Sequence, residues 1–266
     1  MDFKIIHIAE TDSTNRWIRS FCSKDFCSKE NRREGESLQS GVEKTPKLLN
    51  SLDNNSSLAV IAEYQTAGKG CGTNSWESER GKNLTFSILI CPEDIPANEQ
   101  FRITEITSVA MCETLEKYIP QKTTIKWPND IYVGDRKICG MLIENQLQGN
   151  RIKSCIIGIG LNVNQRVFLS DAPNPVSIYQ LTGRDTDLEH LLRSFLETFE
   201  VTFKSKANRH VYEDRLYRKD GWHTFEDENS RFPARLTGVT AEGRLRLLDE
   251  RGQERVYGFK EVRFVI

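Results

Sequence analysis

The chain has 266 residues, 38% hydrophobic and 28% charged, a length that allows one large domain or a domain with a small appendage. Its 37 basic and 38 acidic residues leave a formal charge of −1, so its overall charge does not attract nucleic acid. The opening residues, MDFKIIHIAETDSTN, lack the long apolar run of a signal peptide or membrane anchor. We therefore expect a cytoplasmic protein without membrane contact. Seven cysteines with no close CxxC pair argue against zinc.

The N-terminal third predicts a strand, a helix, a polar insertion and a second strand. Residues 3–10 form the first strand, and a helix over 12–21 is capped by one of its first two residues. Residues 22–57 are polar and contain few large apolar side chains, which predicts an insertion that is loose or weakly helical. A buried type of strand follows at 58–65.

The middle of the chain predicts further strands and two helices. A strand at 83–90 ends before Pro92, and a helix covers 99–119. Residues 123–164 read as three strands that turn at VGDRK and QGN, which favours antiparallel pairing. A helix over 186–203 begins with a capping box of Thr186 and Glu189.

Short alternating strands after about Thr224 predict a small β-barrel at the C-terminus. Strands come mostly in adjacent runs with helices between the runs, which is typical of an α+β protein with a mixed, largely antiparallel sheet. We therefore expect a catalytic domain at 1–224, including the flexible insertion at 22–57, and a small barrel domain at 225–266.

A glycine-rich loop within 63–84, EYQTAGKGCGTNSWESERGKNL, is the first candidate for ligand binding. Glycines allow backbone N–H groups to approach an anion closely. The loop is not a P-loop, because Gly70 follows Lys69 where a hydroxyl residue is required, and it is not a dinucleotide fingerprint, because Thr73 stands where the third glycine belongs. An ordinary flexible hairpin explains the glycines equally well.

Three other motifs carry polar groups that a ligand can use, and each also has a purely structural explanation. KWPNDIYVGDRK at 126–137 breaks at Pro128 and aims side chains into a cleft, or it is a solvated turn with an ion pair. Gly158 and Gly160 leave space beside a strand for a ligand or for packing. The TDSTN segment at 11–15 binds a polar ligand or only caps its helix.

Taken together in this order, the four motifs resemble the catalytic domain of biotin protein ligases over roughly residues 3–165, apart from the insertion. The C-terminal strands resemble the barrel of the same family. The resemblance implies a cytoplasmic enzyme that activates biotin with ATP, forms biotinyl-AMP, and transfers biotin to a lysine of a biotin carboxyl carrier domain, as in acetyl-CoA carboxylase. It also implies Mg²⁺ bound mainly through ATP phosphates, with no protein metal site.

Carried over position by position, the resemblance assigns roles to particular residues. Biotin-binding positions are Ser13, Thr14, Asn15, Gln65, Lys69, Gly70, Cys71 and Lys137. Nucleotide-binding positions are Gly68, Lys69, Trp76, Lys126, Asn129, Asp130 and Asn162. The catalytic residues are Lys137, Lys126 and Asp130. Two anions must meet in this reaction, and cations with backbone donors neutralise their repulsion.

The sequence departs from the family in its loop and in its insertion. The family loop is usually G-R-G-R-x-G-R-x-W, whereas this chain has Lys69 and Cys71 in place of two arginines and Thr73 in place of a glycine. Because lysine and cysteine cannot form the bidentate fork of arginine, we expect weaker retention of the adenylate. The insertion at 22–57 is longer than the usual family connection, and it is read as a surface loop, as a cover for the site or as a contact for the carrier protein.

Several alternatives stay open on the sequence alone. A lipoate–protein ligase or related acyltransferase shares the fold in this reading, and a non-catalytic binding module is the alternative from another class. The chain begins at the catalytic strand and has no basic arm, so we expect no nucleic-acid partner. A homodimer through sheet edges is an option that the resemblance leaves open.

Overall fold

The computed structural model describes residues 1–22, 56–72, 74–92, 95–169, 174–205 and 209–266. Its elements, in chain order, are β1 (Asp2–Thr11), α1 (Thr14–Cys22), β2 (Ser56–Gln65), β3 (Leu84–Ile90), η1 (Ala97–Glu99), α3 (Phe101–Leu115), β4 (Thr123–Lys126), β5 (Asp130–Val133), β6 (Arg136–Gln148), β7 (Arg151–Leu161), α4 (Ile178–Thr182), α5 (Leu188–Lys204), α6 (Arg209–Asp214), β8 (His223–Asp227), β9 (Arg231–Val239), β10 (Leu245–Asp249), β11 (Glu254–Tyr257) and β12 (Val262–Phe264). The expected insertion lies outside the described residues except at its ends, which belong to α1 and β2.

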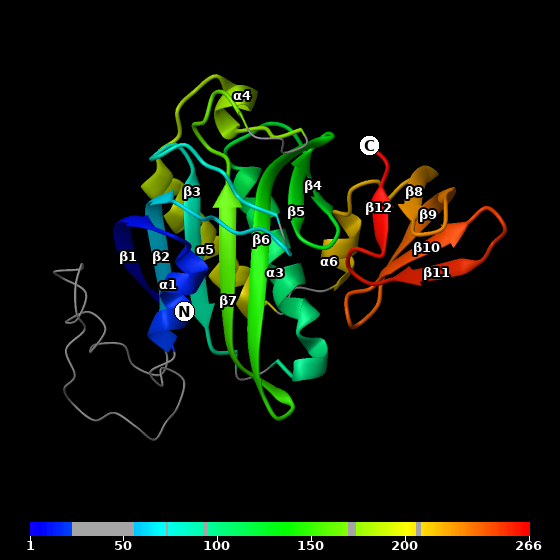
Figure 1. Ribbon diagram of the computed structural model, residues 1–266, viewed down its shortest axis with the longest axis horizontal. Coiled ribbons are helices and arrows are strands. Elements are labelled where there is room, and N and C mark those ends of the chain that lie inside the picture. Colours follow the sequence, from blue (N-terminus) through cyan, green and yellow to red (C-terminus); the bar gives the residue numbers. More distant parts are fainter. Residues whose placement is uncertain (23–55, 73, 93–94, 170–173, 206–208) are drawn as a thin grey trace.

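The main sheet has seven strands in the order β1-β2-β3-β7-β6-β5-β4 (Figure 1). Only β1 and β2 pair in parallel, and every other neighbouring pair is antiparallel. The mixed, largely antiparallel α+β fold expected from the sequence is therefore confirmed. The parallel pair follows from α1, which leads the chain away from β1 before β2 begins.

Both faces of the sheet are covered, and the alternation of side chains along β2 shows how. Leu58 and Val60 are buried with Ile18 of α1 on one face. Ala59 belongs to the larger core on the opposite face, which includes residues of α3 and α5. Successive residues of a strand point to opposite faces, so one strand serves two helical layers (Figure 1). None of the helices in these described layers is both long and apolar enough to cross a membrane.

Two local predictions differ from the structure. The helix α5 is capped by Asp187, whose side chain accepts a hydrogen bond from the His190 backbone N–H at 2.9 Å, so the predicted capping box of Thr186 and Glu189 is wrong. The segment predicted to contain three strands contains four, because Trp127-Pro128 interrupts it and β4 folds back on β5 with Lys126 opposite Asp130.

A second, antiparallel sheet forms the C-terminal part in the order β11-β10-β9-β8-β12. Its first strand, β8, begins at His223, close to the predicted start of the short strands near Thr224. The predicted C-terminal unit of short strands is confirmed as this second sheet, and within the described residues β11 and β12 are its two edges and do not pair with each other. The indole N–H of Trp127 donates a hydrogen bond to the Gly243 carbonyl at 2.9 Å and ties this sheet to the main one.

Candidate active site

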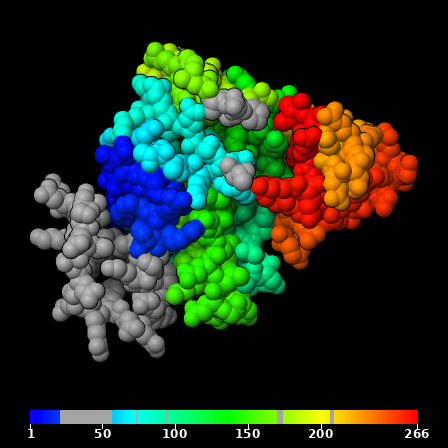
Figure 2. All heavy atoms as spheres, viewed as in Figure 1, coloured from blue at the N-terminus to red at the C-terminus, as the bar shows by residue number. Residues whose placement is uncertain are grey.

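A cavity of about 450 Å³ lies on the α1 face of the main sheet. Its walls come from α1, the end of β2, the glycine-rich loop after β2, the β4–β5 turn, β6, β7 and the segment around β12. Figure 1 shows the glycine-rich loop crossing in front of the sheet, and Figure 2 shows the C-terminal segment coming up against that loop. The cavity is therefore enclosed by the glycine-rich loop, the main sheet and the C-terminal segment, which are far apart in sequence.

One end of the cavity is polar but uncharged. The backbone N–H and the hydroxyl of Thr14 both donate hydrogen bonds to Gln65 Oε1, at 2.8 and 3.1 Å. Ser13, Thr14 and Asn15 are each less than a tenth exposed. Because the Gln65 oxygen accepts both bonds, the N–H groups of its amide are the part left to meet a ligand.

A buried network orients this neutral end from behind. The hydroxyl of Ser87 lies 2.6 Å from both Thr14 Oγ1 and Asn15 Oδ1. The amide of Asn15 donates to Glu144 Oε2 at 2.8 Å, and Arg19 of α1 bonds the other oxygen of that carboxylate. Sequence reasoning missed Ser87 and Glu144, although both alternate with apolar residues on strands that carry predicted site residues.

The floor of the cavity consists of two glycines that face each other across β6 and β7. Gly140 pairs with Gly160, and the indole of Trp76 lies on them: a Cβ built on Gly160 would stand 2.2 Å from that ring. A Cβ on Gly158 would stand 2.2 Å from Asn15 Oδ1. The space that these glycines leave is thus filled by side chains of the site itself.

The position of Trp76 leaves one of its atoms without a partner. Its Nε1 atom is buried and makes no hydrogen bond within the described structure. A buried donor without a partner carries a desolvation cost of about 1–3 kcal/mol, which a ligand acceptor removes. Trp76 therefore has a polar as well as a stacking surface to offer a ligand.

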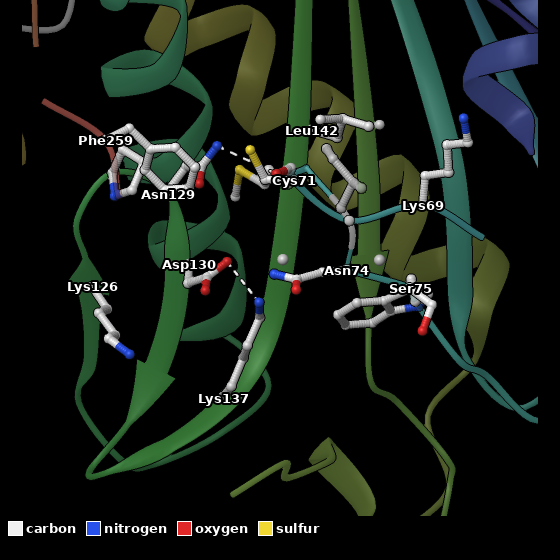
Figure 3. Close-up of a pocket in the computed structure, with 18 of the residues that line it drawn as sticks. Lys69, Cys71, Asn74, Ser75, Lys126, Asn129, Asp130, Lys137, Leu142 and Phe259 are labelled. Atoms are coloured by element: carbon white, nitrogen blue, oxygen red, sulfur yellow. Dashed lines mark hydrogen bonds and ion pairs between the residues drawn. The ribbon is translucent and has the colours of Figure 1, made fainter. Parts of the chain in front are cut away.

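The glycine-rich loop is a short hairpin. Trp76 donates its backbone N–H to the Gly68 carbonyl at 2.9 Å, and Gly70 donates to the Asn74 carbonyl at 2.8 Å. The Gly70 amide, expected to meet an anion, is therefore used inside the hairpin. Lys69 is exposed, and its ammonium group points away from the charged pair of the cavity (Figure 3).

The opposite end of the cavity is cationic. Lys137 Nζ lies 2.8 Å from Asp130 Oδ1, and Figure 3 shows these two side chains pointing toward one another. The Lys137 ammonium is also 5.9 Å from the centre of the Trp76 ring. The backbone of Lys137 is held on both sides, by hydrogen bonds to the Asn174 carbonyl at 2.8 Å and from the Val176 N–H at 2.9 Å. This lysine is thus the best-positioned cation of the cavity.

Lys126 is a second cation at this end, and its side chain is partly buried. Its Nζ atom donates to the Tyr132 hydroxyl at 3.1 Å and lies 5.0 Å from that ring's centre. Burial lowers the pKa of Lys126 below its ordinary value, Asp130 acts in the opposite direction, and Lys137 and Arg218 lower it further. Asn129 completes this end by donating its amide to the Met141 carbonyl at 3.3 Å.

Sequence comparisons agree with this arrangement. Residues 35–162 match the Biotin/lipoate A/B protein ligase family. This stretch, slightly less than half of the chain, is similar to that family. The "Bifunctional ligase/repressor BirA" of Bacillus spizizenii is 29% identical over 82% of this chain and 71% of its own length. The "Biotin--[acetyl-CoA-carboxylase] ligase" of Mycobacterium tuberculosis is 26% identical over 54% of this chain and 53% of its own.

The structural comparison shows the same fold along nearly the whole chain. The biotin protein ligase of Aquifex aeolicus, solved in complex with biotin and ATP, superposes with a TM-score of 0.71 at 23% identity and covers 98% of this chain and 99% of that one. The sequence relatives thus support the predicted resemblance to biotin protein ligases and an enzyme of the ligase class.

The structure brings most of the predicted site residues together. All but two of them line the cavity. Gly68 lies in the loop just outside it, where a Cβ would stand 2.4 Å from the Trp76 carbonyl oxygen. Asn162 is buried and donates its amide to the Val176 carbonyl at 3.1 Å, so in this structure it supports the segment that holds Lys137.

Other cavity residues had no signal in the sequence. From the C-terminal part they are Phe259, Lys260, Val262, Arg263 and Phe264, and Trp127 stands beside them with its ring centre 6.1 Å from that of Phe259. A pattern of short alternating strands predicts a sheet but not which of its turns faces another sheet. Only the tertiary arrangement identifies this part as a wall of the cavity.

Proposed function

We propose that the protein joins biotin to a lysine of a carrier domain in two steps that use ATP. The observation that carries the proposal is a single cavity with a neutral hydrogen-bonding end, a cationic end and a glycine hairpin across it. The neutral end matches the uncharged ureido ring of biotin, and the cationic end matches a carboxylate and phosphates. The Aquifex aeolicus structure with biotin and ATP has the same fold.

In the first step an oxygen of the biotin carboxylate attacks the α-phosphorus of ATP. The new P–O bond gives biotinyl-AMP, and the bond to the β-phosphate breaks to release pyrophosphate. Both reactants are anionic, so fixed cations lower the barrier by offsetting their repulsion. Lys137, oriented by Asp130 at 2.8 Å, is the cation we assign to the carboxylate, and Lys126 is assigned to the phosphates.

In the second step the amine of the carrier lysine attacks the carbonyl carbon of biotinyl-AMP. An amide bond forms, the bond to AMP breaks, and the amine loses a proton to solvent. The neutral end contributes by holding the ring while the anhydride carbon faces the open side of the cavity. The N–H groups of Gln65 donate to the ureido oxygen, and the hydroxyl groups of Ser13 and Thr14 lie beside the ring.

Mg²⁺ requires a separate test against the residues present. Asp130 is the only carboxylate among the residues that line the cavity, and it is already paired with Lys137. Within the described residues no cluster of three or more metal-ligating side chains exists. These residues do not make a protein-held Mg²⁺ site, so we assign the ion to the phosphates of ATP and derive no step through it.

The name of one relative suggests the acceptor. The Mycobacterium tuberculosis protein is named for acetyl-CoA carboxylase, and we propose a biotin carboxyl carrier domain of such a carboxylase as the partner here. In the same reading, residues 1–224 form the catalytic domain, and the C-terminal part contributes one wall of its cavity. The cytoplasm remains our predicted location.

The test is ATP-dependent transfer of labelled biotin to a purified carrier domain. We expect pyrophosphate release with biotin and ATP alone, and labelled carrier only when all three substrates are present. Lys137→Ala is the negative control, and lipoate in place of biotin separates the two substrate types. Absence of pyrophosphate release with biotin, or faster release with lipoate, would overturn the proposal.

A further inference from the structure

The cations of the cavity differ in how far they are already neutralised. Lys137 is paired with Asp130, and Arg263 is paired with Glu226, which Arg231 shares. Lys126 donates a hydrogen bond to the Tyr132 hydroxyl and interacts electrostatically with the nearby Asp130 carboxylate. Lys260 has no ion pair or hydrogen bond from its ammonium group to any residue that the structure describes, although it lines the cavity. An ammonium group without a counter-charge is the natural contact for an anionic ligand.

The ammonium group of Lys260 is held against the glycine hairpin. A Cβ built on Gly72 would stand 2.1 Å from Lys260 Nζ and 3.2 Å from its Cε. Gly72 also has φ +70°, so glycine is required there both for the backbone and for the lysine. Figure 2 shows the C-terminal segment meeting the loop on the surface of the molecule.

The backbone of Lys260 is itself unusual. It adopts φ +70°, a left-handed conformation that few residues other than glycine take. The next residue, Glu261, turns its carboxylate back to the Gly258 N–H and so does not neutralise the lysine. Strained backbone of this kind persists where the surrounding structure holds it, and it is frequent at ligand sites.

We propose that Lys260 binds a phosphate oxygen of the nucleotide and thereby joins the glycine hairpin to the C-terminal sheet over the bound ligand. This inference rests on the proposed function, because it takes ATP as the ligand. It assigns to the C-terminal sheet a cationic contact at the loop, where Cys71 provides no charge. Lys69, the cation within the loop, points away from the charged pair (Figure 3).

The test compares Lys260→Met, Lys260→Arg and Arg251→Met. The first removes the charge and keeps the chain length, the second keeps the charge, and the third removes an exposed cation of the same sheet outside the cavity. We measure ATP affinity by calorimetry with Mg²⁺ present, and the dependence of pyrophosphate release on ATP and on biotin.

We expect Lys260→Met to weaken ATP binding by about tenfold or more, the usual effect of losing a hydrogen bond to a charged group. The KM for biotin stays within about twofold, because the ureido end is unchanged. Lys260→Arg keeps most of the ATP affinity, and Arg251→Met matches the wild type. Equal ATP affinity of Lys260→Met and wild type, or equal losses for ATP and biotin, would overturn the inference.

Failure of the proposed function gives a different result. Wild-type protein that binds ATP but releases no pyrophosphate with biotin contradicts biotin activation and leaves the calorimetric comparison able to support or overturn the role of Lys260. Wild-type protein that releases pyrophosphate, together with a Lys260→Met variant of unchanged ATP affinity, contradicts Lys260 alone.

Discussion

The two ends of the cavity are built on different principles. At the neutral end, Thr14 bonds Gln65, and buried partners bond Thr14 and Asn15, so the geometry is fixed before a ligand arrives. At the cationic end, Lys137 has one carboxylate partner and Lys260 has none among the described residues. The comparison teaches that recognition of the uncharged ring depends on rigid geometry, whereas activation depends on charges left for the ligand.

The largest expected effect is at the cationic end. Replacing Lys137 by alanine removes the best-positioned cation and leaves Asp130 facing the substrate carboxylate, so repulsion is added where attraction is lost. We expect the rate of pyrophosphate release to fall about 10²- to 10³-fold, the scale for losing one charge-stabilising donor. Single-turnover measurements with saturating biotin and ATP give this rate.

Lys137→Arg is the matched control, because it keeps the charge beside Asp130 but changes its shape. We expect an intermediate rate. An alanine variant as fast as the wild type would mean that the charge of Lys137 has no part in activation.

At the neutral end, Gln65→Leu removes the acceptor for two Thr14 donors and the amide donor for the ring. Buried donors left without partners cost about 1–3 kcal/mol, so we expect the KM for biotin to rise by about tenfold or more. The KM for ATP changes little, which separates this end of the cavity from the other. Gln148→Leu, at the exposed end of β6, is the control.

Asp130→Asn tests how the two lysines of the cationic end depend on one carboxylate. Burial lowers the pKa of Lys126, and the charge of Asp130 counteracts part of that effect. The charged form of a lysine is lost as pH rises through its pKa, so a pKa lowered further brings that loss to lower pH. We expect the alkaline decline in pyrophosphate release to begin at lower pH in Asp130→Asn than in the wild type.

The matching measurement is the pH dependence of the rate at saturating substrates, with Tyr132→Phe as a second variant that removes the Lys126 hydrogen bond and keeps Asp130. If the rate of Asp130→Asn declines at the same alkaline pH as that of the wild type, the charge of Lys126 does not limit the reaction.

The sequence predicted those parts of the site that depend on local pattern. Hydrophobic pattern predicted the strands and the helix around Ser13, Thr14 and Gln65, and the resemblance to the ligase family assigned these three residues to the site. The KWPND break allowed two readings: Asn129 and Asp130 do line the cavity, and the ion pair of the alternative reading is also present, between Asp130 and Lys137.

Other features depend on contacts between distant segments and had no local signal. Asp187 caps α5 in place of the predicted Thr186, and both are plausible caps when only the neighbouring letters are known. Lys260 lies against Gly72 in a structure where the C-terminal part packs on Trp127, at the β4–β5 turn. Hydrophobic periodicity and composition predict individual helices and strands, whereas a contact such as that of Lys260 with Gly72 depends on how these elements pack together.

The smallest effect concerns the hairpin between the two ends. Cys71 lines the cavity at a position where the biotin protein ligases that this chain resembles usually carry an arginine. Cys71→Arg therefore adds a guanidinium group that can bind a phosphate through two hydrogen bonds. We expect biotinyl-AMP to leave the variant about threefold to tenfold more slowly, a modest gain because the loop is half exposed and its charges are screened. Cys71→Ala separates loss of the thiol from gain of the fork, and release is followed by trapping the free adenylate. If both variants release it at the wild-type rate, the hairpin does not control retention, and the contact between Gly72 and Lys260 becomes the remaining means of holding the intermediate.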